Sequence, residues 1–283
     1  MCSLLDSPPE PTDACNVLAL RQWVDVATTK PPLLARPYHG PAMTFLQPHP
    51  DDAALSAGGL ISTLNGPISV VTTHALSDST SETEARHKED VSWANSLNVD
   101  IRHLSLHQST THTWKPVHPD DRVKAALPTD IQPGSLVAPA GVGRHPDHAQ
   151  CHRIAFELGA VAFWEDLAFW GVYGMSSDDR AITALNNDIS WILVALDITE
   201  ALASKAYGLK NYSSQSTDTW RPIRHAWTAA REVVAPFRFA ERYFLRGTDN
   251  AESWIQSIGY KTCHSSTITY GTRELFTICA GKA

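Results

Sequence analysis

The chain has 283 residues, of which 43% are hydrophobic, so it is long enough to bury the core of one large α/β domain. Its formal net charge is -7, and no run of Lys or Arg provides the basic patch that nucleic acid or an anionic membrane surface attracts. The N-terminus lacks the pattern of an export signal, and no stretch approaches about 18 consecutive apolar residues. We therefore expect a soluble, cytoplasmic protein that acts on a small molecule, with its oligomeric state left open.

Short apolar runs alternate along the chain with segments of helical periodicity. We expect strands at residues 43–47, 68–73, 101–106, 135–138, 191–198 and 238–245, and we note an aromatic and apolar segment at 162–172. We expect helices at residues 53–64, 81–97, 121–127, 147–158, 199–212 and 220–234. The segment 238–245 is predicted to be an exposed or edge strand, and the Thr- and Ile-rich segment 265–279 to form a late β-hairpin.

This alternation predicts a Rossmann-like α/β fold, with a mostly parallel sheet flanked by helices and a C-terminal extension that adds strands. No repeat or low-complexity linker divides the chain. We therefore expect a single domain over residues 1–283, with a core at about 40–215 and an extension at about 216–283 that shapes the pocket. In such folds, ligands bind beyond the carboxyl ends of the strands.

Two polar clusters follow predicted strands and open predicted helices. His49, Asp51 and Asp52 come directly after the strand at 43–47. A second cluster, at residues 141–148, follows the strand at 135–138 and contains His145, Asp147 and His148. If both strands belong to one parallel sheet, the two clusters emerge at the same edge and can meet over one pocket.

The residue types in these clusters suit metal-assisted hydrolysis. Two His and one Asp make a ligand set for Zn²⁺ with an open position for water, although Fe²⁺ also accepts two His and one carboxylate. Such a metal lowers the pKa of water and polarises a carbonyl, while an adjacent carboxylate that does not bind the metal can act as the base. The competing interpretation is that the acids cap helices and the histidines are ordinary surface groups, but the matched position of both clusters argues against it.

The motifs His49-Pro50-Asp51-Asp52 and His145-Pro146-Asp147-His148 resemble those of the PIG-L/LmbE-like family of zinc-dependent de-N-acetylases. This family includes deacetylases of glycosylphosphatidylinositol, mycothiol, bacillithiol and antibiotic synthesis. A third match, in the same order along the chain, lies at residues 205–215, where Lys205, Leu209, Tyr212, Ser214 and Gln215 fit a family stretch. The resemblance spans roughly residues 43–215.

The resemblance implies a role for each cluster residue. His49, Asp52 and His148 would bind zinc, and Asp51 would be the general base. His145, oriented by Asp147, would stabilise the oxyanion of the tetrahedral intermediate, most usefully as an imidazolium.

Arg86 matches an arginine that contacts substrate in some family members. The alternative is that Arg86 is a solvated helix residue paired with a nearby acid. The acids within reach along the chain are Glu82, Glu89 and Asp90.

The chain departs from the family pattern at the rim of the predicted site. Family members usually carry Glu where this chain has Ala53, and some carry Tyr where it has Gly143. An Asp common after the third strand is not evident at residues 104–108. For these reasons the identity of the substrate is not carried over from the family.

The sequence therefore predicts a zinc-dependent hydrolase that removes an acetyl or other acyl group from an amine of a small, sugar-containing metabolite, such as an N-acylated amino sugar or glycoside. One alternative is an amidase that removes a larger acyl group from a thiol conjugate or secondary metabolite. Another is a non-catalytic zinc-containing binding protein, suggested only by Ala53 and Gly143. A metallophosphoesterase would normally need two metals, and the sequence offers ligands for one convincing site.

Overall fold

The computed structural model describes residues 36–37, 42–109, 115–141, 145–166, 189–214, 220–233, 235–270 and 273–282. Its strands are β1 (Arg36–Pro37), β2 (Met43–Gln47), β3 (Leu64–Asn65), β4 (Ile68–Thr72), β5 (Asp100–His103), β6 (Leu136–Pro139), β7 (Ala162–Trp164), β8 (Trp191–Asp197), β9 (Ala240–Arg246), β10 (Tyr260–Tyr270) and β11 (Arg273–Lys282). Its helices are α2 (Asp52–Ile61), α3 (Thr80–Leu97), α4 (Asp120–Ala126), α5 (Pro146–Glu157), α6 (Leu202–Leu209), α7 (Trp220–Glu232) and α8 (Thr248–Ser257).

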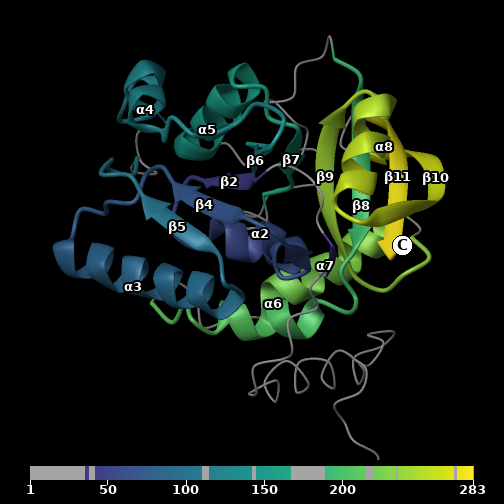
Figure 1. Cartoon of the computed structure of the whole chain (residues 1–283), viewed down its shortest axis with the longest axis horizontal. Helices are drawn as coiled ribbons and strands as arrows, with labels where there is room; N and C mark the ends of the chain where they lie inside the picture. Colours follow the sequence, from purple (N-terminus) through teal and green to yellow (C-terminus); the bar gives the residue numbers. More distant parts are fainter. Residues whose placement is uncertain are drawn as a thin grey trace, which may run out of the picture.

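A nine-stranded sheet in the order β10-β11-β8-β9-β7-β6-β2-β4-β5 runs through the molecule (Figure 1). The pairs from β7 to β5 are parallel, as is the pair β8–β11. Strand β9 is antiparallel to both of its neighbours, and β10 and β11 form an antiparallel hairpin. This confirms the predicted mostly parallel α/β sheet with additional C-terminal strands.

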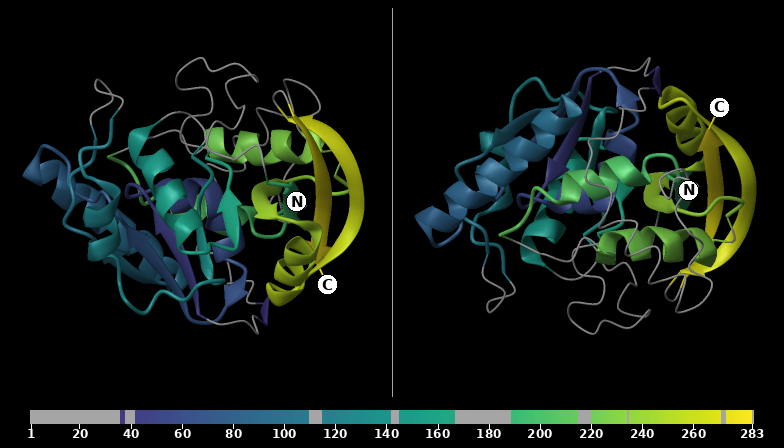
Figure 2. Two further views of the ribbon diagram at one scale, coloured as in Figure 1. Left: turned by 90° about the horizontal axis from the view of Figure 1, so that it is seen from above. Right: turned by 90° about the horizontal axis from the view of Figure 1, so that it is seen from below.

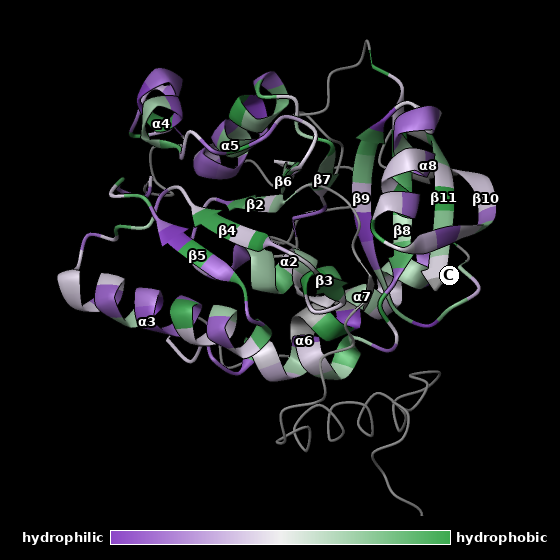
Figure 3. Cartoon of the chain, in the orientation of Figure 1, coloured by the Kyte–Doolittle hydropathy of each residue, from purple (hydrophilic) through white to green (hydrophobic). Residues whose placement is uncertain are grey.

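Helices cover both faces of the sheet, and the two largest buried apolar clusters of the described residues lie beneath them. The first cluster lies under α2, α3 and α8 and includes Phe45, Trp93 and Trp254. The second lies under α5 and α7 and includes Phe163 and Phe244. Figure 2 shows the helices on either side of the sheet and the long β10–β11 hairpin closing one end. In Figure 3 the central strands are largely hydrophobic, whereas α3 alternates polar and apolar segments, as expected for a helix with one face in water.

The prediction of an exposed or edge strand at 238–245 is wrong. Strand β9 lies between β7 and β8, and its residues 240–245 are all buried. Two charged residues in this strand, Glu241 and Arg242, are buried because each has an oppositely charged partner.

Other differences concern the limits of elements. The aromatic and apolar segment 162–172, to which no element was assigned from the sequence, contains strand β7 at Ala162–Trp164, and residues 167–172 lie outside the described part of the chain. Helix α8 (Thr248–Ser257) was not expected from the sequence. In the described ranges, no helix is both long and apolar enough to cross a membrane.

Candidate active site

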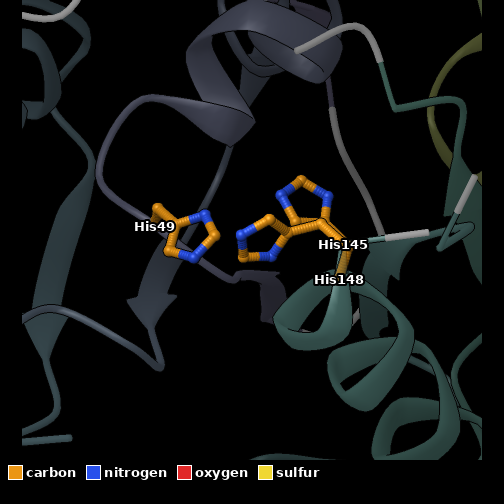
Figure 4. Close-up of side chains that lie close together, drawn as sticks. All are labelled: His49, His145 and His148. Atoms are coloured by element: carbon orange, nitrogen blue, oxygen red, sulfur yellow. The ribbon is translucent and has the colours of Figure 1, made fainter. Parts of the chain in front are cut away.

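Two strand-to-helix junctions lie side by side at the carboxyl edge of the sheet. Strands β2 and β6 are neighbours, with Thr44 opposite Leu136, so the turn into α2 lies beside the turn into α5. Figure 4 shows that His49 from the first turn faces His145 and His148 from the second. Each of these three buried histidines offers a ring nitrogen that lies within 4.8 Å of the other two.

Asp52 lies between two of these imidazoles. Its Oδ2 atom is 3.3 Å from His49 Nδ1 and 3.2 Å from His148 Nε2. Ligands bound to zinc at about 2.0–2.1 Å in a tetrahedron are about 3.3 Å from one another. The two distances from Asp52 Oδ2, to His49 Nδ1 and to His148 Nε2, therefore match those between neighbouring ligands of one tetrahedral metal ion.

The far nitrogen of each of these histidines contacts a carboxylate. His49 Nε2 lies 2.9 Å from Asp147 Oδ2, and His148 Nδ1 lies 2.8 Å from Asp166 Oδ1. Metal-binding histidines usually donate their other N–H to a carboxylate or carbonyl, which fixes the tautomer and the ring orientation. Both imidazoles are thus held with the opposite nitrogen directed at Asp52.

Asp166 was not among the residues predicted from the sequence. It follows the short strand β7, just as Asp51 and Asp52 follow β2. The signal was an acidic pair, Glu165-Asp166, at the end of an apolar run. The run had been interpreted as a longer aromatic and apolar segment, which hid the end of the strand.

Asp147 was predicted to orient His145, but its carboxylate contacts a different histidine. In addition to the contact with His49, it accepts hydrogen bonds from the backbone N–H of Ser109, at 2.8 Å, and from the Ser109 hydroxyl. The contact between Asp147 and His145 that the structure describes runs from the Asp147 backbone N–H to His145 Nδ1, at 3.3 Å. His145 is therefore held by the start of α5, where it acts as the helix cap.

Burial and neighbouring charges act in opposite directions on the pKa values of the proposed ligands. Burial lowers the pKa of His148, but Asp52 and Asp166 outweigh it and raise this pKa to about 10. Burial also lowers the pKa of His49, yet the bonds to Asp147 and Asp52 leave it above its ordinary value. For Asp52, burial raises the pKa, but His148 and His49 hold it well below the usual range. Asp52 therefore keeps the negative charge that a metal ion would need.

Asp51 stands next to the ligand set in a strained conformation. Its φ angle is 107°, in the left-handed region that a residue with a side chain rarely adopts. Burial and the charge of Asp52 raise the pKa of Asp51 to about 8, while Arg86 and His49 act in the opposite direction. A divalent cation beside it would lower this pKa and favour the carboxylate. Strain at this position indicates that the turn is shaped by function rather than by stability.

His145 differs from the other two histidines. Burial, together with the charges of His49 and His148, lowers its pKa to about 3, so the ring is neutral near pH 7. Because its Nδ1 accepts a hydrogen bond from the Asp147 backbone, the remaining proton lies on Nε2. In this arrangement we expect His145 to donate one N–H from a neutral ring, whereas the resemblance favours an imidazolium.

Arg86 is buried, with 8% of its surface exposed, so it is not a solvated helix residue, but the pairing with Glu82 that the same interpretation expected is present. Its guanidinium donates to Gln108 Oε1 at 3.0 Å and to the Pro50 carbonyl at 3.4 Å, and it lies 3.8 Å from Glu82. Arg86 Nε is buried and has no hydrogen-bond partner among the residues that the structure describes. This places an unfilled donor beside the turn that carries Asp51.

A buried network of hydrogen bonds connects the turn between β2 and α2 to Asp90 and Tyr212. Gln47 Oε1 accepts from the backbone N–H of Ala53 at 2.9 Å, and Gln47 Nε2 donates to Asp90 at 2.9 Å. The hydroxyl of Tyr212 donates to the same carboxylate of Asp90 at 2.6 Å. Tyr212 of the third motif thus reaches the site through this network, whereas Gln215 of that motif and Gly143 lie outside the described residues.

Comparisons with known proteins agree with this geometry. Residues 44–158 match the family described as GlcNAc-PI de-N-acetylase, PIG-L. A 2'-N-acetylparomamine deacetylase of Streptomyces fradiae is 24% identical over 218 residues, which cover 64% of this chain and 77% of that protein.

Among solved structures, the zinc-inhibited form of the teicoplanin deacetylase Orf2 is similar, with 18% identity and a TM-score of 0.50. The complex of a deacetylase with teicoplanin has 19% identity and a TM-score of 0.51. Each match covers 74% of this chain and 100% of the other chain. At these identities, the two structures show a shared fold. The match of residues 44–158 relates this part of the chain to the PIG-L family.

Proposed function

We propose that this chain is a metal-dependent N-deacetylase that hydrolyses the amide of an N-acylated amino sugar in a small metabolite. The observation that carries this proposal is the contact of one Asp52 oxygen with both His49 and His148, at the spacing of tetrahedral zinc ligands. Beside it stands Asp51, a second carboxylate that is not part of this contact. A ligand set with an adjacent base is the arrangement that metal-assisted hydrolysis requires.

His49 Nδ1, Asp52 Oδ2 and His148 Nε2 would hold the metal, which we propose to be Zn²⁺, with Fe²⁺ as the alternative for the same donors. When bound there, the metal would polarise the amide carbonyl and lower the pKa of the attacking water. Asp147 and Asp166 would keep the two imidazoles in the tautomers that leave these nitrogens available.

Asp51 would accept the proton of the water as it attacks the carbonyl carbon, and would later return that proton to the departing amine. His145 would donate its Nε2–H to the oxygen that becomes negative in the tetrahedral intermediate. A neutral imidazole can serve in this way, because the hydrogen bond strengthens as the negative charge develops. Arg86, whose guanidinium lies beside the Pro50 carbonyl in the turn that carries Asp51, would contact the substrate.

The substrate class is supported by the relatives. One acts on 2'-N-acetylparomamine and another binds teicoplanin, as their descriptions state. We propose that this chain likewise acts on an acylated amine of a small sugar-containing metabolite, where the acyl group is acetyl or a larger chain.

The direct test measures the release of acetate and free amine from a panel of N-acetylated glucosaminyl compounds. Metal-free protein and protein reconstituted with Zn²⁺ or Fe²⁺ are assayed side by side, with metal added from below to above one equivalent. This range matters because a related deacetylase is described in a zinc-inhibited form. Metal-dependent release would support the proposal, whereas no release from acetyl or longer acyl compounds by metal-loaded protein would contradict it.

A pair of variants separates Asp52 from His145 as the third metal ligand. Asp52→Ala should lose bound zinc, as measured by metal analysis after dialysis. His145→Ala should keep zinc and lose about 10²- to 10³-fold in kcat, the usual cost of one oxyanion donor. The opposite pattern would mean that the three histidines bind the metal and that Asp52 does not.

A further inference from the structure

We infer that two adjacent residues of β9, Glu241 and Arg242, are positioning residues that hold the two halves of the metal site from opposite faces of the sheet. Neighbouring residues of a strand point to opposite faces. Each of these two side chains is only 2% exposed. Both lie outside residues 44–158, the part of the chain that matches the family. The inference rests on the proposed metal site but not on the identity of the substrate.

Glu241 holds helix α2, which begins with Asp52. Its Oε1 accepts from the backbone N–H of Gly59 at 2.8 Å, and its Oε2 accepts from that of Leu60 at 2.9 Å. Its other partners are Lys205, with Nζ 2.5 Å from Oε1, and Tyr243, whose hydroxyl donates to Oε2 at 3.0 Å.

Lys205 also contacts α2, because its Nζ donates to the Leu55 carbonyl at 2.6 Å. In an ideal helix this carbonyl accepts a hydrogen bond from the Gly59 amide. The Glu241–Lys205 ion pair therefore contacts the carbonyl and the amide of the same helical turn. A rigid helix fixed in this way places its first residue, Asp52, relative to β9.

Arg242 holds the other half of the site. Its guanidinium donates two hydrogen bonds to the Glu165 carboxylate, at 2.7 and 2.6 Å, and a third to Glu232 at 2.6 Å. The Glu165 backbone N–H in turn donates to the Arg242 carbonyl at 2.9 Å. Residue 165 is therefore fixed through both its backbone and its side chain. The next residue is Asp166, which contacts His148 Nδ1.

The contacts of Glu241 with α2 and of Arg242 with Glu165 together fix the positions of Asp52 and His148 relative to the same strand, β9. Buried ion pairs are expensive to desolvate, and apolar residues of similar volume often replace them without loss of stability. Stability alone therefore does not account for two buried charges in succession on a central strand. Placement of two metal ligands does account for them, since a shift of α2 or of Asp166 would change the distance between Asp52 and His148.

The test measures zinc affinity by chelator competition in Arg242→Lys, Glu241→Gln and the wild-type full-length chain. Arg242→Lys keeps the charge but loses the two parallel bonds to Glu165. Loss of a group that orients a metal ligand typically lowers affinity by about 10- to 100-fold, so we expect about tenfold for each variant. Phe244→Leu, in the apolar core on the same strand, is the matched control, because it lowers stability without touching either charge.

Thermal unfolding of the metal-free proteins accompanies each affinity. The inference holds if the two charge variants bind zinc about tenfold more weakly while Phe244→Leu, with a similar loss of stability, binds it normally. Unchanged affinity in the charge variants, or an equal loss in Phe244→Leu, overturns it. If Arg242→Lys does not fold, Glu165→Gln replaces it in the measurement of zinc affinity, because it weakens the same Arg242–Glu165 contact with a smaller change. Zinc binding by a wild type without deacetylase activity would refute the proposed reaction and leave this inference standing.

Discussion

The region from β2 to β7 and the region from β8 to β11 contribute in different ways to the same site. In the first, parallel strands end in turns that carry His49, Asp51, Asp52, His145 and His148. In the second, two charged residues of β9 are buried against partners from other elements, Glu241 against Lys205 of α6 and Arg242 against Glu165, which follows β7. The residues proposed to act in the reaction thus lie at strand ends, whereas the geometry of the metal site depends on buried charged residues of β9.

This comparison predicts that changes in the first region remove turnover, while changes in the second weaken metal binding or stability. The largest effect is expected for Asp51→Asn. Loss of a general base should lower kcat by about 10³- to 10⁴-fold, and zinc should remain bound at one equivalent. Steady-state kinetics and metal analysis of the same sample check this. Loss of the metal in this variant would instead show that Asp51 is a metal ligand and not the base.

A smaller effect is expected for Asp166→Asn, at the boundary between the two regions. The amide oxygen can still accept from His148, but it lacks the charge that strengthens this contact. We expect zinc affinity to fall by about 10-fold or more, within the range for groups that orient metal-binding histidines. Chelator competition measures it. Asp130→Asn, which changes an exposed carboxylate paired with Arg102, should leave the affinity unchanged.

Two neighbouring glycines in α2 test its contact with the second region. An added Cβ at Gly59 would lie 2.9 Å from Glu241 Oε1 and from Ile198, too close for either to remain in place. Gly59→Ala should therefore lower the free energy of unfolding by about 1–3 kcal/mol. Gly58→Ala is the matched control, because its Cβ would meet an ordinary contact of 3.7 Å with Lys205. That variant should be neutral or more stable by up to about 1 kcal/mol, since alanine favours a helix. Denaturant unfolding that ranks the two variants equally would show that α2 is not held against β9 and Ile198.

The smallest effect is expected for Asp51→Gly. Glycine adopts a φ of 107° without strain, so the variant should be more stable than the wild type by about 1 kcal/mol, although it is inactive. Asn98→Gly is the control, because Asn98 has a φ of 58°, which asparagine tolerates. Its stability should change by only a few tenths of a kcal/mol. Denaturant unfolding of the metal-free proteins measures both. Equal effects at the two positions would mean that Asp51 stores no special strain.

The sequence was sufficient to predict the alternation of strands and helices, the mostly parallel sheet and the two polar turns of the site. These features depend on local patterns: apolar runs form strands, periodic segments form helices, and side chains that follow parallel strands meet at one edge. The bounds of β2, Met43–Gln47, matched the expected strand, and α3 began one residue before the expected helix, at Thr80.

Only the tertiary structure decided how the site is held. Three features join residues that are not neighbours in the chain. They are the position of β9 between β7 and β8, the hydrogen bonds of Glu241 to α2, and the contact of Asp166 with His148. A charged residue in a strand looks exposed when its partner is unknown, because burial of a charge is favourable only when an opposite charge neutralises it. The sequence predicted that Asp147 orients His145, but its carboxylate contacts His49 instead. His49 is 98 residues away in sequence, and only the fold brings the two side chains together, at 2.9 Å.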